Sequence, residues 1–574
     1  MACRAGGTLR ERPASPAAVR PVRSGLHLPG SPPMMMNKQS PIPSPTRGPA
    51  RRFGLFNALC AALAALVLAL PAASWAQDLA SPCARVAGWT QGDARVLGSE
   101  FVAAGQFAPP QAGLGRLAKI PGLDPTGHAR VELKRAFCRV TLQLVPDADS
   151  DIRAEVWLPV SGWNGKFMAS GSFGWGGEMM YSGMMGPLQE GYATASSDTG
   201  HDASQPGQDG GRFLQGHPAR LTDYAYRAFH ETTVAAKALI RRFYGQAPTH
   251  AYWVGCSLGG LEGLIEAKRY PDDYDGIVVG APPNPLAAFN AAQLWPYWLI
   301  AQDPRRLIPP EKFTMVHQAV MQACGSARER QDDVLDRPDQ CRFMPAQLAC
   351  RAGDAPDCLT AAQVDLLEKI YAGPANPRTG ERIFPGPALG TERDFSAYAS
   401  SKPFQNALDL FRYVVFENPD WQPDHFDWDK DMALAMRKAS LLSVEPDLGA
   451  FFARGGKLIF YIGWNDYHNP AELIDYYQKL VKASGRPARD VARLFASPGM
   501  GHCFGGSGCD TFDKLGAISG WVEQGTAPER LIAARVDQQG KVVRTRALCA
   551  YPDVARPAGP GDSGDAANGV CQAP

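Results

Sequence analysis

Residues 255–260 read GCSLGG and place Ser257 between glycines in the pattern Gly-x-Ser-x-Gly. Residues 251–254 (AYWV) are apolar and β-prone, and residues 261–267 (LEGLIEA) carry apolar side chains at helical spacing. The pattern predicts a strand, a sharp turn and a helix, with the serine at the turn. Glycines permit the strained backbone of such a turn, and a serine presented there is typical of a catalytic nucleophile. An ordinary glycine turn is the alternative, but the predicted strand and helix favour the nucleophile.

A serine nucleophile needs a base that takes its proton and an acid that orients the base. Residues 457–462 (KLIFYI) read as a buried strand leading to Asp466, and residues 493–496 (RLFA) read as another strand leading to His502. The order serine, acid, histidine, with acid and base on loops after strands, is that of α/β-hydrolases. The sequence therefore predicts an α/β fold of the α/β-hydrolase type, with Ser257, Asp466 and His502 as a catalytic triad. A helix N-cap and an ordinary loop histidine are the alternatives for the last two, but their positions, order and flanking glycines favour the triad.

Two cysteines flank the predicted catalytic residues. Cys256 directly precedes Ser257, and Cys503 directly follows His502. If the serine and the histidine lie within hydrogen-bonding distance, these neighbours could meet in a disulfide. Such a bond would tie the two catalytic loops together across a long sequence separation and would typically contribute about 2–4 kcal/mol.

This arrangement resembles the tannase and feruloyl esterase family, which includes mono(2-hydroxyethyl) terephthalate hydrolase. The resemblance covers residues 84–574. The motifs that carry it are residues 163–167 (WNGKF), 197–201 (SDTGH), 274–282 (YDGIVVGAP) and 499–506 (GMGHCFGG). It implies the same triad and makes Cys256–Cys503 the active-site disulfide of the family.

An oxyanion hole needs two backbone N–H groups aimed at the charge that develops on the substrate oxygen. The residue after the nucleophile, Leu258, should supply one of them. Residues 171–177 (GSFGWGG) form a glycine-rich turn after an earlier predicted strand and should supply the other. The family resemblance points to Gly174, and a plain glycine loop is the alternative.

A second histidine, His201, lies close to Asp198 in the sequence. The two could form a second base or a metal pair. No further histidine or acid stands at ligand spacing, and His201 does not follow a late strand. We therefore expect a structural role that supports the nucleophile turn.

The composition argues against nucleic-acid binding as the main task. The chain has 574 residues, with 58 Lys and Arg against 57 Asp and Glu, so its formal net charge is +1. No basic stripe stands out. At this length the chain can form a large core with an inserted domain.

The N-terminal part reads as a targeting segment. Arg51 and Arg52 precede an apolar stretch over residues 53–70, Pro71 breaks it, and residues 74–76 (SWA) offer a cleavage pattern. This predicts a signal peptide cleaved after Ala76, hence a secreted or periplasmic protein with no membrane attachment after cleavage. A retained membrane anchor is the alternative. Met34, Met35 or Met36 could be the true start.

Export to an oxidising compartment makes disulfides the expected state of the cysteines. Of 13 cysteines, Cys3 and Cys60 precede the predicted cleavage site. The family resemblance implies three further pairs, and a fifth is plausible: Cys324–Cys341, Cys350–Cys358 and Cys549–Cys571, then Cys83–Cys138. Cys509 is left over, either as a free thiol or because one pairing is wrong. No Cys-x-x-Cys spacing supports a zinc site.

The composition and the predicted secondary-structure pattern change twice along the chain. Strand-like and helical patterns alternate up to residue 285, residues 286–448 are rich in aromatics and prolines, and strand patterns resume at Lys457. The predicted domains are an extension with signal peptide (1–76), the first part of the core with the nucleophile turn (77–285), a lid (286–448), and the second part of the core with the acid and base (449–574). The tail after Tyr551 is expected to be irregular. Candidate pocket-lining aromatics in the lid are Trp295, Trp298, Phe404, Phe411, Tyr413, Phe416 and Trp421.

The resemblance also implies a calcium site in the lid, between the cysteines that match Cys324 and Cys341. Many family members have three aspartates there, which together with backbone carbonyls supply the hard oxygens that Ca²⁺ prefers. Here residues 325–334 read GSARERQDDV and keep only Asp332 and Val334 of that pattern. A single carboxylate is a poor calcium site, so structural calcium is not favoured, and no cofactor is expected for the chemistry.

Gly325 and Arg328 stand where the family has its other two aspartates. We hypothesise that Arg328 replaces the charge of the ion by pairing with Asp332 or Asp336. The alternative is a shifted site built from Asp332, Asp333, Asp336 and Asp339.

Together these features predict a secreted serine carboxylesterase that acts through an acyl-enzyme. The resemblance implies small esters of aromatic or phenolic acids as substrates, as for feruloyl esterases and tannases. The terephthalate ester is not favoured, because no residues match those that hold its carboxylate. An acyltransferase or peptidase using the same triad, and a non-catalytic binding protein with a hydrolase fold, are the alternatives.

Overall fold

The computed structural model describes residues 82–107, 131–537, 540–558 and 565–574. All described residues belong to one compact unit within residues 71–574. The predicted signal peptide, its cleavage site, the alternative starts, Cys3 and Cys60 lie outside the described residues. No helix among the described residues is long and apolar enough to cross a membrane.

A ten-stranded sheet forms the centre of this unit, in the order β1-β2-β5-β6-β8-β7-β9-β10-β11-β12. Its strands are β1 (Thr90–Gln91), β2 (Ala94–Val102), β5 (Phe137–Leu144), β6 (Ile152–Pro159), β7 (Lys166–Ser170), β8 (Ala193–Ser197), β9 (His250–Cys256), β10 (Gly276–Gly280), β11 (Lys457–Gly463) and β12 (Ala492–Ser497). The first strands pair antiparallel, and those from β8 through β7 to β12 pair parallel. This confirms the predicted α/β class.

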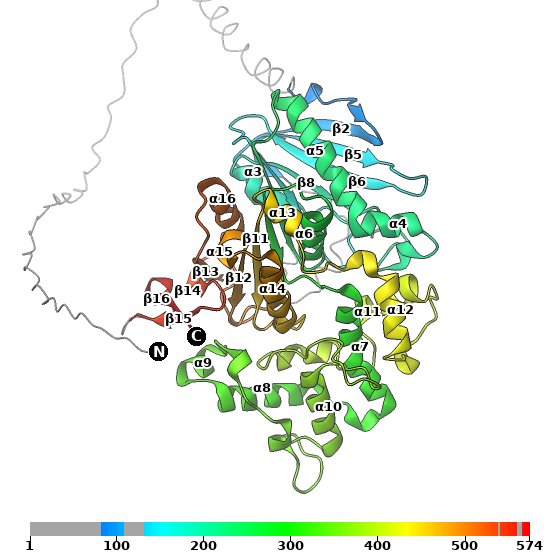
Figure 1. Ribbon diagram of the computed structural model, residues 1–574, viewed down its shortest axis with the longest axis vertical. Helices are drawn as coiled ribbons and strands as arrows, with labels where there is room; N and C mark the ends of the chain where they lie inside the picture. Colours follow the sequence, from blue (N-terminus) through cyan, green and yellow to red (C-terminus); the bar gives the residue numbers. More distant parts are fainter. Residues whose placement is uncertain (1–81, 108–130, 538–539, 559–564) are drawn as a thin grey trace, which may run out of the picture. The chain divides into compact units, whose positions relative to one another are not determined.

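Helices cover both faces of the sheet (Figure 1). The helices of this part are α3 (Tyr181–Gln189), α4 (Pro218–Thr222), α5 (Ala228–Tyr244), α6 (Leu258–Arg269), α13 (Gly449–Ala453), α14 (Pro470–Ser484), α15 (Ala488–Val491) and α16 (Lys514–Gln524). In β10, Ile277 packs against Gly263 of α6, whereas a Cβ on Gly276 would point at Ile518 of α16. Successive residues of a strand point to opposite faces, so α6 and α16 lie on opposite sides of the sheet.

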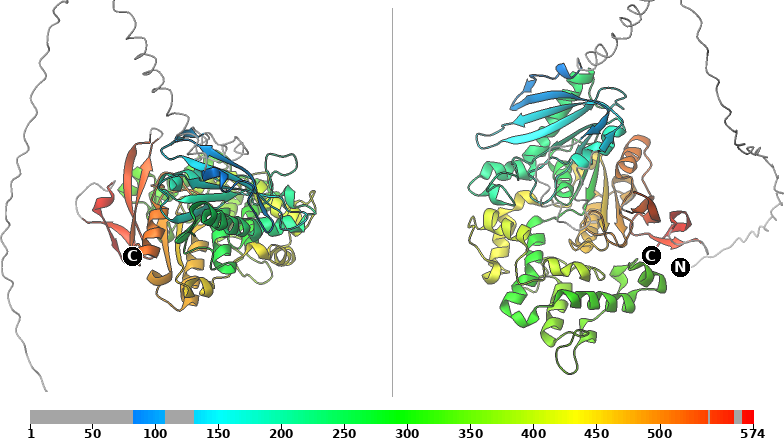
Figure 2. Two further views of the ribbon diagram at one scale, coloured as in Figure 1. Left: turned by 90° about the horizontal axis from the view of Figure 1, so that it is seen from above. Right: turned by 180° about the vertical axis from the view of Figure 1, so that it is seen from behind.

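The segment between β10 and β11 is helical. It contains α7 (Leu286–Gln302), α8 (Pro310–Cys324), α9 (Ala327–Asp332), α10 (Ala361–Ala372), α11 (Gln405–Leu410) and α12 (Lys430–Lys438), and part of it buries an apolar core of its own. Figures 1 and 2 show these green to yellow helices gathered beyond one end of the sheet. We call residues 286–448 the helical insertion; its function as a lid and its exact boundaries stay predictions.

β10 and β11 pair in parallel although the whole insertion separates them in sequence. Gly280 lies opposite Tyr461 in this ladder. The two parts of the chain therefore form one sheet, and the loops after β9 and β11 emerge at the same edge.

The C-terminal residues form small antiparallel ladders. β13 (Arg530–Val536) pairs with β14 (Val542–Cys549), and β15 (Val554–Pro557) pairs with β16 (Gly569–Gln572). A further two-stranded ladder joins β3 (Gly105–Phe107) and β4 (Val131–Leu133). The prediction of an irregular tail after Tyr551 was wrong, because two short segments too proline- and glycine-rich to show strand alternation pair beside a disulfide.

The described cysteines form five disulfides, and they are the five expected pairs: Cys83–Cys138, Cys256–Cys503, Cys324–Cys341, Cys350–Cys358 and Cys549–Cys571. Cys509 is the free thiol among the described cysteines, and it is buried. Of the two explanations offered for the leftover cysteine, the structure supports the free thiol.

Candidate active site

Ser257 occupies the sharp turn between β9 and α6. Its backbone has φ 59° and ψ −125°, a strained conformation for a residue with a side chain. The flanking glycines are required by close backbone approach, since a Cβ on Gly255 would lie 2.1 Å from the carbonyl oxygen of Gly259. The Ser257 amide donates to the Gly280 carbonyl at 2.9 Å, which fixes the turn to the neighbouring strand. The predicted strand, turn and helix are confirmed.

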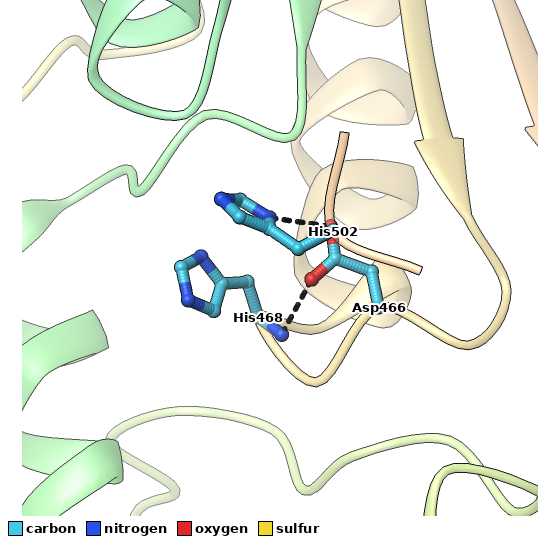
Figure 3. A group of neighbouring side chains, drawn as sticks. All are labelled: Asp466, His468 and His502. Carbon is cyan, nitrogen blue, oxygen red and sulfur yellow. Dashed lines mark hydrogen bonds and ion pairs between the residues drawn. The ribbon is translucent and has the colours of Figure 1, made fainter. Parts of the chain in front are cut away.

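Asp466 and His502 meet at the edge of the sheet where β11 and β12 end. His502 Nδ1 lies 2.9 Å from Asp466 Oδ2, and the other carboxylate oxygen accepts the His468 backbone N–H at 2.8 Å (Figure 3). Asp466 is fully buried. A carboxylate can only accept, so Nδ1 carries the hydrogen and Nε2 is left as the basic nitrogen.

The disulfide brings the serine turn and the histidine loop together. Cys256 and Cys503 have a Cα–Cα distance of 6.0 Å although 247 positions separate them in sequence. His502 Nε2 lies 3.7 Å from Cys503 Sγ. The basic nitrogen of the histidine therefore faces the bridge whose other half immediately precedes Ser257.

The glycine-rich loop after β7 lies against the start of α6. The Ser172 carbonyl accepts the Gly259 N–H at 2.7 Å, and the Ser172 N–H donates to Glu262 Oε2 at 2.8 Å. Burial raises the pKa of Glu262 to about 7. Within the described part of the chain, the amide hydrogens of Gly174 and Leu258 have no hydrogen-bond partner. Both are thus available to a ligand oxygen beside the nucleophile turn.

His201 supports this glycine-rich loop by packing. Its ring stacks on Phe213 with centroids 3.5 Å apart, and a Cβ on Gly177 would lie 2.8 Å from its Nε2. Burial lowers the pKa of His201 to about 3, so the ring is neutral. Asp198 instead accepts the backbone N–H groups of Arg153 and Gly200. The geometry matches a structural role.

The loop that the family resemblance marked for calcium is held by ion pairs. Val334 is buried beside Gly499. The four aspartates considered as ligands each face cationic partners: Asp332 with Arg544 (2.8 Å) and Arg328 (3.6 Å), Asp333 with Arg393 (2.7 Å) and His317 (2.9 Å), Asp336 with Arg546 (2.8 Å), and Asp339 with Arg337 (2.6 Å). This donor set does not fit a calcium ion, because guanidinium groups occupy the carboxylates that would bind it.

Side chains that could hold a metal form two groups among the described residues: Asp466, His468 and His502, and separately His230, Glu266 and Asp273. Neither group contains Asp332, and neither contains His201. The first group contains two of the candidate catalytic residues, Asp466 and His502, together with His468.

His468 was not among the site residues predicted from the sequence. Its ring lies beside that of His502, with centroids 3.8 Å apart, and contacts Phe289 of α7 edge-on at 4.6 Å (Figure 3). Burial, followed by the charge of His502, lowers the pKa of His468 well below its usual value. The only available signal was its position two residues after Asp466.

A small cavity adjoins His468, with a volume of about 30 Å³. Its walls come from α7, from residues 370–398 and from the loop after β11. Trp295 is the one aromatic of the seven proposed that lines it. The others pack within or against apolar cores instead: Trp298, Phe404, Phe411, Tyr413, Phe416 and Trp421.

The fold, together with the position of the candidate residues on loops after β9, β11 and β12, defines an α/β-hydrolase. A family model described as tannase and feruloyl esterase matches residues 138–572, and the chain belongs to this family of carboxylic ester hydrolases. It is 35% identical over 488 residues to an uncharacterized esterase of Xanthomonas campestris pv. campestris, covering 76% of this chain and 84% of that protein. It is 32% identical over 462 residues to a probable feruloyl esterase B-1 of Aspergillus oryzae, covering 75% and 83%. The crystal structure of feruloyl esterase B from Aspergillus oryzae superposes with a TM-score of 0.76 at 27% identity, covering 86% of this chain and all of the other.

Proposed function

We propose that the protein is an exported serine esterase that hydrolyses esters of aromatic or phenolic acids through an acyl-enzyme. Membership in an esterase family and the names of its relatives support the reaction class. Five disulfides support an oxidising compartment. The observation that carries the assignment of residues is the orientation of His502, with one ring nitrogen on Asp466 and the other toward the Cys256–Cys503 bridge.

In this mechanism the Ser257 hydroxyl attacks the ester carbonyl carbon while His502 Nε2 takes its proton. Asp466 holds the imidazole and stabilises the imidazolium that forms. The amide hydrogens of Gly174 and Leu258 bind the oxyanion of the tetrahedral intermediate. The C–O bond to the alcohol breaks, and the alcohol leaves with the proton from His502. Water then attacks the acyl carbon of the acyl-enzyme while His502 Nε2 takes its proton. The bond to the Ser257 oxygen breaks, His502 returns the proton to that oxygen, and the free acid leaves.

The chemistry needs no metal ion, and we propose that the ion pairs around Asp332 take the place of the calcium of other family members. Each guanidinium supplies the positive charge that the carboxylate needs, and it does so from within the fold.

The test compares hydrolysis of methyl ferulate, methyl gallate and a short aliphatic methyl ester by the purified protein. The aromatic esters are expected to have the higher kcat/KM. A chromogenic aryl ester should give a burst equal to the enzyme concentration, and Ser257→Ala should lower kcat by about 10⁴-fold or more with an unchanged circular dichroism spectrum. Near-normal turnover by this variant would refute the assignment. Added alcohols that divert most of the acyl group would identify a transferase instead.

A further inference from the structure

A second group of side chains that could bind a metal ion lies away from the candidate triad. His230 of α5, Glu266 of α6 and Asp273 of the loop between α6 and β10 each offer one ligand atom, and these atoms lie within 4.8 Å of one another. Glu266 lies roughly 13 Å along α6 from Ser257, at a rise of about 1.5 Å per residue. Because β9 and β10 are parallel, α6 returns the chain to the edge where these strands begin. The group is therefore remote from the residues proposed for ester hydrolysis.

Glu266 is the member of this group whose charge is not compensated. Its side chain is fully buried, and neither carboxylate oxygen has a hydrogen-bond partner among the described residues. Burial, followed by the charge of Asp273, raises the pKa of Glu266 well above its usual value. A buried carboxylate without a donor keeps the full cost of its desolvation, so a proton or a cation has to supply what the neighbouring side chains do not.

The other two members are oriented by their neighbours. His230 Nδ1 lies 2.6 Å from Asp273 Oδ2, and the ring of His230 stacks on Tyr270 with centroids 3.5 Å apart. Lys237 Nζ lies 3.7 Å from Asp273 Oδ1 and also donates to the Asp273 backbone carbonyl. The cation of Lys237 therefore balances Asp273 first, whereas Glu266 forms no ion pair with any described residue.

A proton shared by the two carboxylates is the simplest alternative to a metal ion. Protonated Glu266 would donate to Asp273 through one oxygen, but its other oxygen would stay buried without a donor. A divalent cation can use both oxygens of Glu266 together with Asp273 and a ring nitrogen of His230. The cation therefore completes all three side chains, and the proton does not.

The kind of ion follows from the ligand atoms. One imidazole nitrogen with two carboxylates suits Zn²⁺, whereas Ca²⁺ requires about six to eight oxygen ligands and Mg²⁺ prefers oxygen throughout. Zinc bonds of about 2.0–2.2 Å set two ligands roughly 3.4 Å apart in a tetrahedral site, so the contact between His230 Nδ1 and Asp273 Oδ2 has to open by about 0.8 Å. The ion replaces the hydrogen of Nδ1, which leaves to solvent as a proton.

An ion can reach this group from solvent. The side chains of His230 and Asp273 are 22% and 12% exposed. Asp273 and Lys237 also line a surface cleft of about 530 Å³. Water in this cleft can complete the tetrahedron around the ion.

We propose that His230, Glu266 and Asp273 bind a zinc ion that ties α5, α6 and the loop before β10 together. The ion is structural: it holds the end of the helix whose beginning carries Ser257, and it takes no part in the ester chemistry. This site goes beyond the proposed esterase function and does not depend on it.

The test is titration calorimetry of chelator-treated protein with zinc, calcium or magnesium chloride near neutral pH. Zinc is expected to bind the wild-type protein with a Kd in the micromolar range or tighter, and calcium and magnesium are expected to give no saturable heat. At free zinc of about 100 times Kd, Tm should rise by about 3 °C. X-ray absorption of the zinc-loaded protein should show a single imidazole among nitrogen and oxygen ligands.

Glu266→Gln and His230→Phe should each weaken zinc binding by about 100-fold or more and leave a Tm rise below about 1 °C. The phenyl ring of the second variant can keep the stack on Tyr270. The matched control for the first is Glu262→Gln, because Glu262 is also buried on α6 but accepts the Ser172 N–H at 2.8 Å. The control for the second is His217→Phe, which removes a histidine paired with Asp149 at 2.9 Å. Both controls should keep the full rise in Tm.

A wild-type protein that shows neither saturable zinc heat nor a rise in Tm would overturn the site and leave the shared proton as the explanation for Glu266. Zinc binding that is unchanged in both variants would also overturn it. Two imidazoles in the absorption spectrum would do the same, since they would place the ion at His468 and His502. If one variant does not fold, the other decides against its control, and if neither folds, the absorption spectrum decides.

Discussion

The bridge between Cys256 and Cys503 is the feature whose removal tests the site most directly. Replacing both cysteines by alanine opens a loop of 247 positions, the longest closed by any of the five disulfides. Loop-closure entropy for this separation gives about 5.5 kcal/mol of stabilisation, an upper value that neglects residual structure in the unfolded chain. The two smaller bridges inside the loop shorten it little and lower the figure by only about 0.1 kcal/mol.

Cys350→Ala with Cys358→Ala is the matched control. That bridge closes only 8 positions, in the helical insertion, which corresponds to about 2.5 kcal/mol. With an unfolding entropy of about 1 kcal/mol/K for a cooperative unit of roughly 500 residues, Tm should fall by about 5 °C without the active-site bridge and by about 2–3 °C in the control. Thermal melting followed by circular dichroism measures both values.

Activity should separate the two double variants more sharply than stability does. Cys503 has φ 66°, a backbone conformation that is strained for cysteine and that the bridge helps to hold. Once the bridge is gone the histidine loop can relax, and a displacement of about 1 Å at the base costs about 10²-fold in rate. We expect kcat on a chromogenic ester at 25 °C to fall by about 10²-fold or more, against less than about twofold in the control. A folded double variant with normal kcat and a Tm loss no larger than the control's would refute the reasoning.

Three other changes probe the acid, the buried glutamate and the ion-paired loop. Asp466→Asn should lower kcat by roughly 10⁴-fold without unfolding the protein, since an amide cannot hold His502 in the required tautomer. Stopped assays at high enzyme concentration measure the residual rate, and a loss of kcat below tenfold contradicts the role of Asp466 as the acid of the triad. Because burial raises the pKa of Glu262 from 4.5 to about 7, the folded state binds this proton more tightly and wild-type stability declines by about 3 kcal/mol as pH rises from about 4.5 to 7. The Tm of Glu262→Gln minus that of wild type should therefore increase by about 3 °C across this window, and a flat difference would be contrary evidence. Chelator-treated protein should show no micromolar calcium binding by titration calorimetry, and clear saturable heat would mean that the ion displaces Arg544 or Arg328 from Asp332.

The nucleophile turn could be predicted from sequence because most of its requirements are local. The need for glycine at Gly255 is local, because a Cβ there would meet the carbonyl oxygen of Gly259, and the strand and helix on either side have their own apolar patterns. The need for glycine at Gly259 is not local, because a Cβ there would meet the backbone of Gly171 and Ser172 in the loop after β7. The acid and base were predictable for a related reason, since each follows a strand of continuous apolar residues and the edge of a parallel sheet collects such loops.

The sequence could not indicate His468 or its cavity. The ring reaches His502 only because the loop after β11 packs against α7, whose Phe289 lies far earlier in the chain. No periodicity records that contact. The seven candidate pocket-lining aromatics were chosen from composition, with most of them expected to belong to the core of the lid, and most of them do pack in or against the apolar cores.

The candidate triad and the cavity beside His468 depend on different parts of the structure. The strands β9, β11 and β12, with the Cys256–Cys503 bridge, determine where Ser257, Asp466 and His502 lie, and none of these elements belongs to the helical insertion. The cavity walls come largely from the insertion, which buries part of its surface in a separate apolar core. Substitutions in the insertion should therefore change the cavity while the positions of Ser257, Asp466 and His502 are kept. The loop that carries both Asp466 and His468 is the exception, because a change in it alters the acid and the cavity together.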